Sequence, residues 1–152
     1  MTDHTGVYPL EDGWLSITCR GNAVSRIGFS PEKPEETGKT ALSDAVFGQI
    51  KAWFSGKRKE LDFPTVSDGT DFQKRVCAEL KKIRYGQTLT YGEVAFRVGC
   101  PGGARAVGMA CNKNPLPFIV PCHRVVGRNG AMVGYALGLE LKKRLLELEK
   151  EV

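Results

Sequence analysis

Hydrophobic and polar residues alternate in two short segments near the start of the chain. Residues 14–19 (WLSITC) alternate weakly, and residues 24–29 (VSRIGF) follow after a Gly21-Asn22 break. Alternation on both sides of a turn signal is typical of a β-hairpin. We therefore predict strands over these two segments, and a last short strand of the same region at residues 61–63.

Helical spacing replaces the alternation after a polar, proline-containing loop at residues 30–39. Ser43 and Asp44 are residue types that cap helices, and Gly56 is typical of a helix end. The apolar residues between them recur at helical intervals: Ala45, Val46, Ile50, Trp53 and Phe54. The pattern predicts one helix, which begins at a Ser43-Asp44 cap and runs through Phe54.

Three short helices are predicted beyond a linker at residues 65–69 (TVSDG). The first is capped at Thr70 and stops at Gly86, the second covers residues 91–98, and the third covers residues 104–112. A glycine-rich turn precedes the third helix. Three short helices in this arrangement are typical of a helix-turn-helix unit.

An apolar run and a final helix complete the pattern. Residues 118–126 are apolar and strand-like although they contain Pro121, and residues 138–151 form a helix rich in Leu, Lys and Glu. The whole pattern predicts an α/β protein. It divides into a small α/β scaffold domain at residues 1–64 and a domain at residues 70–152 that carries the helix-turn-helix.

The basic charge is concentrated in the second predicted domain. The formal net charge is +5, with 22 Lys and Arg against 17 Asp and Glu. Residues 1–65 hold 8 basic and 9 acidic side chains, whereas residues 66–152 hold 14 and 8, so the two parts carry −1 and +6. This asymmetry favours a polyanionic partner such as nucleic acid, with simple solubility as the alternative.

Composition argues against several other classes of protein. No apolar run approaches the roughly 20 residues of a membrane span, and residues 1–10 lack the basic and apolar regions of a signal peptide. The five cysteines are odd in number and widely spaced, unlike those of a disulfide scaffold. With two histidines and no CxxC pair, we expect no metal, no cofactor and a reducing, cytoplasmic location.

The third helix of the predicted helix-turn-helix has a slim outer face. A helical wheel places four residues on the core side: Ala104, Val107, Gly108 and Cys111. It places five on the outer side: Arg105, Ala106, Met109, Ala110 and Asn112. Small side chains around one long cation suit a nucleic-acid groove. The alternative is an internal helix with a surface arginine, but residues 81–128 carry eight basic side chains and one acidic, a bias that phosphate contacts require.

A cysteine lies beside a histidine and an arginine within the apolar run. Cys122, His123 and Arg124 are consecutive. Cations stabilise the thiolate, which is the nucleophilic form, so Cys122 is the candidate nucleophile. The alternative is a buried structural cysteine, which is our interpretation of the other four. Neighbours in a strand point to opposite faces, so contact between Cys122 and His123 requires a turn or a bridging water.

The last helix offers His123 an orienting partner. Glu149 lies at the edge of an apolar stripe formed by Leu141, Leu145, Leu148 and Val152. A partly buried carboxylate requires a hydrogen-bond partner, and His123 is the candidate. Together with Cys122, this pair would form a Cys–His–Glu triad, in which Glu149 orients His123 and His123 acts as the base for the thiol. The alternative is a solvated Glu149 near Lys142 at a frayed helix end.

These residues occur in an order that resembles the O6-alkylguanine-DNA alkyltransferase family. Residues 121–125 (PCHRV) are similar to the active-site string of the family, and 104–108 (ARAVG), Asn114-Pro115 and 90–92 (TYG) match in order and spacing. The resemblance covers residues 70–149. It implies an RNase H-like α/β form for the first domain and a winged-helix-like DNA-binding form for the second.

The resemblance also implies roles for the residues of the site. The catalytic residues are the alkyl acceptor Cys122, the water-mediated base His123, its partner Glu149 and the bracing residue Asn114. The residues that bind the flipped base are Tyr91, Val125, Tyr135 and Ala136. The residues that contact DNA are Arg105, which replaces the extruded nucleotide, and Thr90, Ala106 and Arg128.

The implied function is DNA repair. The protein is expected to bind double-stranded DNA as a monomer, to flip O6-alkylguanine out, and to transfer the alkyl group irreversibly to Cys122 in one turnover. The expected location is the cytoplasm, or the nucleus in a eukaryote. The first alternative is a non-catalytic sensor of alkylguanine, although sensor relatives carry tryptophan in place of the cysteine. The second is a Cys–His hydrolase, for which no oxyanion motif is visible.

Overall fold

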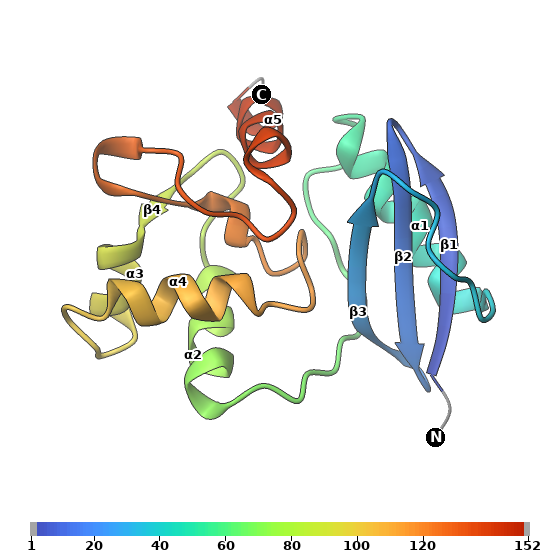
Figure 1. Ribbon diagram of the computed structural model, residues 1–152, viewed down its shortest axis with the longest axis horizontal. Helices are drawn as coiled ribbons and strands as arrows, with labels where there is room; N and C mark the ends of the chain where they lie inside the picture. Colours follow the sequence, from blue (N-terminus) through green and yellow to red (C-terminus); the bar gives the residue numbers. More distant parts are fainter. Residues whose placement is uncertain (1–2, 151–152) are drawn as a thin grey trace. The chain divides into compact units, whose positions relative to one another are not determined.

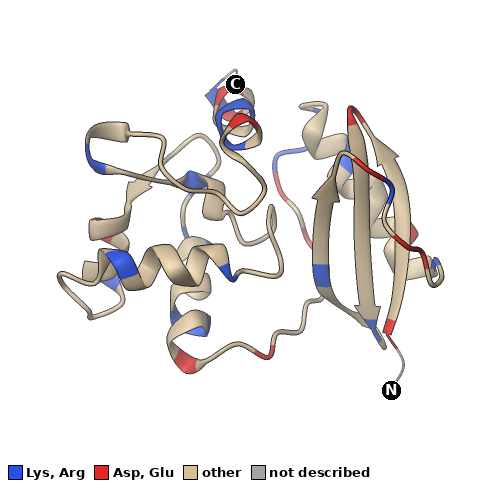
Figure 2. Ribbon diagram, viewed as in Figure 1, with Lys and Arg blue, Asp and Glu red and all other residues tan. Residues whose placement is uncertain are grey.

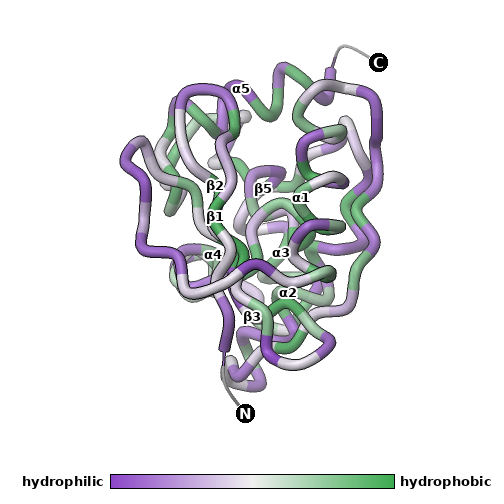
Figure 3. The backbone as a smooth tube through the Cα atoms, turned by 90° about the vertical axis from the view of Figure 1, so that its right-hand side faces the viewer, coloured by the Kyte–Doolittle hydropathy of each residue, from purple (hydrophilic) through white to green (hydrophobic). Residues whose placement is uncertain are grey.

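The computed structural model describes residues 3–150, and the chain forms two compact units (Figure 1). The first unit ends at Ser67 and the second begins at Asp68. Each unit has its own core of buried apolar side chains. Figure 3 shows hydrophobic residues, in green, along the backbone. Within the described residues, no helix combines the length and the apolar character that crossing a membrane requires.

An antiparallel sheet of three strands forms the first unit. The strands are β1 (Asp3–Leu10), β2 (Gly13–Arg20) and β3 (Ala23–Ser30), and β2 lies between the other two. The predicted hairpin of β2 and β3 is confirmed, and buried positions alternate along all of β2. The sequence pattern does not predict β1, because Gly6 and Pro9 weaken the strand signal. Proline is tolerated in β1 because β1 is an edge strand.

Helix α1 (Ala41–Phe54) packs against all three strands. The Thr40 hydroxyl accepts the Ser43 N–H at 3.1 Å, and the Ser43 hydroxyl accepts the Thr40 N–H at 2.8 Å. The prediction that Ser43 begins the helix is therefore wrong. Ser43 is the third helical residue of a capping box whose cap is Thr40. The helix buries its apolar side chains Val46, Ile50 and Trp53.

The segment after α1 pairs with the sheet later than predicted. Residues 61–63 form no strand, because the backbone of Asp62 bonds instead to the side chain of Gln49 at 2.8 and 2.9 Å. Thr65 makes an isolated parallel bridge with Val24, at the start of the segment predicted as a linker. The first unit therefore closes on β3 through one bridge rather than through a fourth strand.

Helices dominate the second unit. Its described elements are α2 (Asp71–Leu80), β4 (Leu89–Thr90), α3 (Tyr91–Arg97), α4 (Ala104–Asn112), β5 (Val125–Val126) and α5 (Leu139–Lys150). The four predicted helices are confirmed, although α2 ends at Leu80 rather than near Gly86. Helices α2, α3 and α4 pack on one another, as a helix-turn-helix unit requires. Glu151, the last residue of the predicted final helix, and Val152, which belongs to the predicted apolar stripe, lie outside the described residues.

A capping box fixes the start of α3. The Thr90 hydroxyl accepts the Glu93 N–H at 3.1 Å, and the Glu93 carboxylate accepts the Thr90 N–H at 2.9 Å. The predicted cap is therefore confirmed. Tyr91 is the first residue of the helix that this cap begins, so the cap fixes the position of its backbone.

Residues 118–126 form a compact turn rather than the predicted strand. Phe118 has a φ of +77°, in the left-handed region, and residues 122–124 form a 3-10 turn. Strand pairing in this run consists of β5, parallel to β4, and an isolated bridge between Val120 and Pro117. Pro121 offers no N–H to a ladder. Most of the run is buried, and periodicity alone does not distinguish a buried turn from a buried strand.

Candidate active site

The 3-10 turn at residues 122–124 places Cys122 beside Asn114. The side-chain amide of Asn114 donates to Cys122 Sγ at 3.4 Å and to the Val120 carbonyl at 3.1 Å. The amide oxygen of Asn114 accepts the Leu116 N–H at 2.9 Å. One side chain therefore ties the preceding loop to the turn and fixes the position of the sulfur.

Burial dominates the electrostatics of Cys122. Cys122 is 4% exposed, and all five cysteines are free thiols. Burial raises the pKa of the Cys122 thiol to about 11, and the hydrogen bond from Asn114 lowers it only in part. The expectation that Arg124 stabilises the thiolate is wrong, because Arg124 points toward Glu149. At neutral pH the sulfur is therefore a protonated thiol that needs a base when it reacts.

His123 is completely buried and bonds to the last turn of α5. Its Nε2 lies 2.9 Å from Glu149 Oε2, so the contact predicted from the sequence is present. An ionised carboxylate only accepts hydrogen bonds, so Nε2 carries the proton and Nδ1 carries the lone pair of the neutral ring. Burial lowers the pKa of His123, and the Glu149 carboxylate offsets this in part. The ring is therefore neutral at pH 7.

Arg124 holds both oxygens of Glu149. Its Nε donates to Oε1 at 2.8 Å, and its Nη2 donates to Oε2 at 2.7 Å. Its Nη1 donates to the Ile83 carbonyl at 2.8 Å, and the guanidinium lies 5.6 Å from the centre of the Tyr85 ring. This contact is not predicted from the sequence, because Arg124 joins three segments that are distant in the chain.

Glu149 remains ionised although it is only 2% exposed. Burial raises the pKa of this carboxyl, but the hydrogen bonds from His123 and Arg124 outweigh burial and hold the pKa at about 2. The alternative of a solvated side chain at a frayed helix end is therefore wrong. The carboxylate instead ties α5 to the 3-10 turn.

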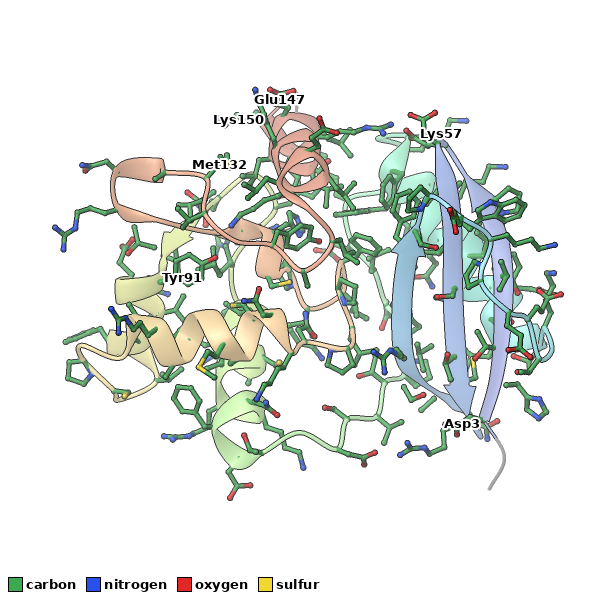
Figure 4. All side chains as sticks on the ribbon, viewed as in Figure 1. Asp3, Lys57, Tyr91, Met132, Glu147 and Lys150 are labelled. Carbon is green, nitrogen blue, oxygen red and sulfur yellow. The ribbon has the colours of Figure 1, made fainter. Side chains whose placement is uncertain are left out.

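A buried lysine joins α5 to the loop at residues 131–137. The Lys142 ammonium donates to the Val133 and Gly134 carbonyls, both at 3.1 Å, and lies 3.4 Å from the Tyr91 hydroxyl. The Tyr91 hydroxyl donates to the Val133 carbonyl at 3.0 Å; Figure 4 shows Tyr91 below the loop that carries Met132. Burial raises the pKa of Tyr91 to about 12 and lowers the pKa of Lys142.

The role of Lys142 is not among the predictions, in which Lys142 occurs only in the alternative of a solvated Glu149. A signal is nevertheless present in the sequence. Lys142 precedes Leu145 and Leu146 by three and four residues, so it shares the apolar face of α5. A lysine on such a face is either a stem that extends to solvent or a buried group with polar partners. The structure shows the second case.

The same loop brings a second tyrosine to the site. The Tyr135 hydroxyl is buried without a hydrogen-bond partner among the described residues. Burial, with Cys122 and Glu149 nearby, raises its pKa well above the usual range. Ala136 is exposed and Val125 is fully buried. A buried hydroxyl without a partner is costly, so Tyr135 is poised to bond to a polar group that enters the site.

Helix α4 presents the slim basic face that the sequence predicts, with one correction. Arg105, Ala106 and Met109 are exposed, and Figure 2 shows a basic segment, in blue, on the helix that is α4 in Figure 1. Ala110 is buried instead of exposed, because α4 packs against both α2 and α3. Arg128 is also exposed, whereas the hydroxyl of Thr90 is used in the cap of α3.

We predict that Glu149→Gln flattens the acid branch of the stability curve. The folded-state pKa of about 2 lies below the ordinary value for glutamate. The ionised side chain therefore contributes stability above the ordinary pKa, and this contribution is lost as the pH falls toward 2. At about 1.4 kcal/mol per pKa unit, the loss is about 3 kcal/mol. Urea unfolding of the full chain between about pH 2 and pH 6 measures it.

The control is Glu147→Gln, because Glu147 is exposed on the same helix (Figure 4). This variant should keep the pH dependence of the wild type. Glu149→Gln should also unfold more easily at pH 7, because Arg124 loses its ionised partner. Parallel pH curves for Glu149→Gln and the wild type would contradict the assignment.

A second prediction concerns the loop that Lys142 holds. Lys142→Met removes a charged donor from two loop carbonyls, and such bonds contribute about 1.5–3 kcal/mol. Amide hydrogens of residues 131–137 should therefore exchange with deuterium about tenfold faster or more. Lys143→Met changes an exposed neighbour and should leave the exchange unchanged. Equal exchange in the two variants would mean that Lys142 does not hold the loop.

Comparison with known proteins gives consistent results for sequence and structure. The family model for the DNA binding domain of 6-O-methylguanine DNA methyltransferase matches residues 71–151. A methylated-DNA–protein-cysteine methyltransferase of Mycobacterium bovis is 44% identical over 143 residues, which are 91% of this chain and 87% of that protein. The protein of the same name from Methanosarcina acetivorans is 52% identical over 101 residues, 66% of this chain and 65% of its own length.

Solved structures match both units of the chain. The crystal structure of the O6-methylguanine methyltransferase of Mycobacterium tuberculosis has a TM-score of 0.89 and 37% identity, and the match covers 99% of this chain and 94% of that one. The structure of Mycobacterium tuberculosis OGT in complex with DNA gives 0.89 and 38%, with coverages of 97% and 93%. The predicted α/β fold class is confirmed. A family model over more than half of the chain, and relatives alike along nine-tenths of it, place this protein in the 6-O-methylguanine DNA methyltransferase family.

Proposed function

We propose that the protein repairs DNA by moving the alkyl group of O6-alkylguanine onto Cys122. The observation that carries this proposal is the buried Cys122 thiol, which Asn114 holds at 3.4 Å next to His123, the residue that bonds to Glu149. The relatives are named methylated-DNA–protein-cysteine methyltransferases, and one matching structure was solved with DNA. The product is a thioether, which has no easy leaving route, so each molecule acts once.

The transfer is a direct displacement at the alkyl carbon. His123 Nδ1 takes the thiol proton through a water molecule, the sulfur bonds to the carbon, and the bond between that carbon and O6 breaks. The electron pair leaves with the guanine. The base is needed because the pKa of the Cys122 thiol is about 11, and such catalysis contributes about 10²–10⁴-fold. Glu149 stabilises the imidazolium through Nε2.

The two tyrosines and the loop at residues 131–137 bind the guanine and stabilise it as a leaving group. Tyr91 gives its hydroxyl proton to the N3 atom of the ring, which avoids an anionic leaving group. The Lys142 ammonium, 3.4 Å from that hydroxyl, stabilises the resulting phenolate. Tyr135 and the N–H of Ala136 face the base and O6. The carbonyls of Cys122 and Val125 accept hydrogen bonds from the guanine amine.

Helix α4 is the element that we assign to the DNA groove. The reacting carbon is not accessible in line inside a duplex, so the nucleotide is flipped out. Arg105 takes its place in the stack, and the small Ala106 beside it lets the helix approach the minor groove. Thr90 and Arg128 contact the phosphates. The charge of +6 on residues 66–152 supports binding of double-stranded DNA.

We assign the protein to the cytoplasm, or to the nucleus in a eukaryote, as a monomer. Five free thiols suit a reducing compartment, and the substrate is chromosomal DNA. One chain supplies every residue that the mechanism uses. The alkyl transfer requires no cofactor, because the sulfur, the base and the proton donor are all side chains.

Incubation with a duplex that contains O6-methylguanine should add one methyl group to each chain. Intact mass measures the addition, and peptide mapping should locate it on Cys122. Cys122→Ser should abolish the adduct. Cys111→Ser is the matched control, because Cys111 is also buried and burial raises its pKa to about 12. This variant should react like the wild type.

The mass measurement, together with assays of DNA binding and of small-molecule turnover, distinguishes the alternative functions. Tight, salt-dependent binding of the duplex without an adduct would identify a non-catalytic sensor. Turnover of small thioesters or amides without any need for DNA would identify a Cys–His hydrolase. Either result would overturn the proposal.

Arg105→Ala should slow repair of paired lesions more than reaction with the free alkylguanine base. The arginine stabilises the flipped state, whose unstacking costs a few kcal/mol, so the loss on duplex should reach about tenfold or more. Lys113→Ala, at the other end of α4, removes a charge of the same sign and should slow both reactions little. Equal losses of Arg105→Ala on the two substrates would contradict the role in flipping.

A further inference from the structure

Glu149 is bound more tightly than a partner that merely orients His123 needs to be. One hydrogen bond at 2.9 Å fixes the imidazole. Arg124 nevertheless bonds to both carboxylate oxygens, at 2.8 and 2.7 Å, and anchors itself on the Ile83 carbonyl at 2.8 Å. The exposed fractions of His123, Arg124 and Glu149 are 0%, 8% and 2%. Charges interact strongly in such a dry cluster.

Glu149 and Arg124 act on His123 with opposite signs. The carboxylate favours the imidazolium, and the guanidinium disfavours it. A buried carboxylate at 2.9 Å without a counter-charge would stabilise the protonated ring and so act against the effect of burial. A protonated ring has no lone pair, so it takes no proton from the water beside Cys122.

The other groups around the turn do not replace Arg124. The titratable and charged groups that the packed elements bring near this cluster are Lys142, Cys122, Cys77, Cys111, Tyr85, Tyr91 and Tyr135. Burial raises the pKa of the thiols and of the phenols, so they are neutral at pH 7. Lys142 is the second cation, but it bonds to the loop carbonyls and not to Glu149. Arg124 is therefore the cation that pairs with this carboxylate.

We propose that Arg124 is a positioning residue for the alkyl transfer: it fixes both oxygens of Glu149 and, by balancing the charge of that carboxylate, keeps His123 neutral until Cys122 reacts. The inference rests on the proposed function. According to this proposal, the proton that leaves Cys122 stays on His123. It is not passed on to Glu149, because Arg124 keeps Glu149 ionised. The proposal also makes the turn after α2 part of the site, through the Ile83 carbonyl.

Histidine titration of the full chain tests this link without DNA. The chain has only two histidines, and His4 lies in β1, exposed, where it serves as an internal standard. By NMR, Arg124→Gln should raise the pKa of His123, Glu149→Gln should lower it, and His4 should not change. Arg84→Gln removes an exposed arginine beside Ile83 and should leave His123 unchanged. A folded Arg124→Gln variant with an unchanged His123 titration would overturn the proposal.

The rate of Cys122 methylation against pH supplies the second readout. Arg124→Gln should move the acid limb to higher pH and slow the reaction at pH 7 about tenfold or more. A merely structural role would lower the rate by the same factor at every pH. Arg124→Lys keeps the charge but not the fork, and its acid limb should stay at the position of the wild type.

Two further outcomes are decisive. Where Arg124→Gln does not fold, Arg124→Lys carries the test, and a raised His123 pKa in that variant would contradict the proposal because the charge is retained. A wild-type protein that gains no methyl group on Cys122 would overturn the proposed function. The histidine titration would still decide, in that case, whether Arg124 controls the charge of His123.

Discussion

One buried carboxylate holds the second unit together. Burying an ionised group is costly unless hydrogen bonds and a counter-charge replace water, and Glu149 obtains both from His123 and Arg124. Arg124 in turn bonds to the Ile83 carbonyl, just beyond the end of α2. The last turn of α5, the 3-10 turn and the end of α2 are therefore fastened around a single side chain. The backbone of Cys122 is held in place because the two residues that follow it, His123 and Arg124, both bond to this carboxylate.

The thiol is positioned but not activated in the resting protein. Asn114 holds the sulfur, while burial keeps the pKa of the thiol at about 11. A thiolate reacts with oxidants and metals far more readily than a thiol does. For a protein that acts once, a reaction of the cysteine with anything other than its substrate is a permanent loss. Storage as a thiol, with a neutral base in the next residue, limits reaction to the moment when a substrate aligns with both.

Local signals in the sequence are sufficient for the helices and part of the site. The Thr70 and Thr90 caps and the periodicity of the last helix act over a few residues, so both the helices and the burial of Glu149 are predictable. The structure of residues 118–126 is not predictable in this way, because a continuous apolar run is compatible with a buried strand and with a buried turn. The fork of Arg124 and the three bonds of Lys142 join segments that are distant in the chain. Such contacts leave little trace in a single sequence.

The two buried cations of this unit have different electrostatic consequences. Arg124 faces a carboxylate, so its charge is balanced before any reaction begins. Lys142 bonds to two carbonyls and a phenol and, among the described residues, to no carboxylate, so its charge is not balanced. Negative charge on Cys122 favours the ammonium of Lys142. A displacement places negative charge first on the sulfur and then on the departing base. A fixed ammonium that destabilises the resting site therefore stabilises each of these charges as it develops, because no solvent has to reorient.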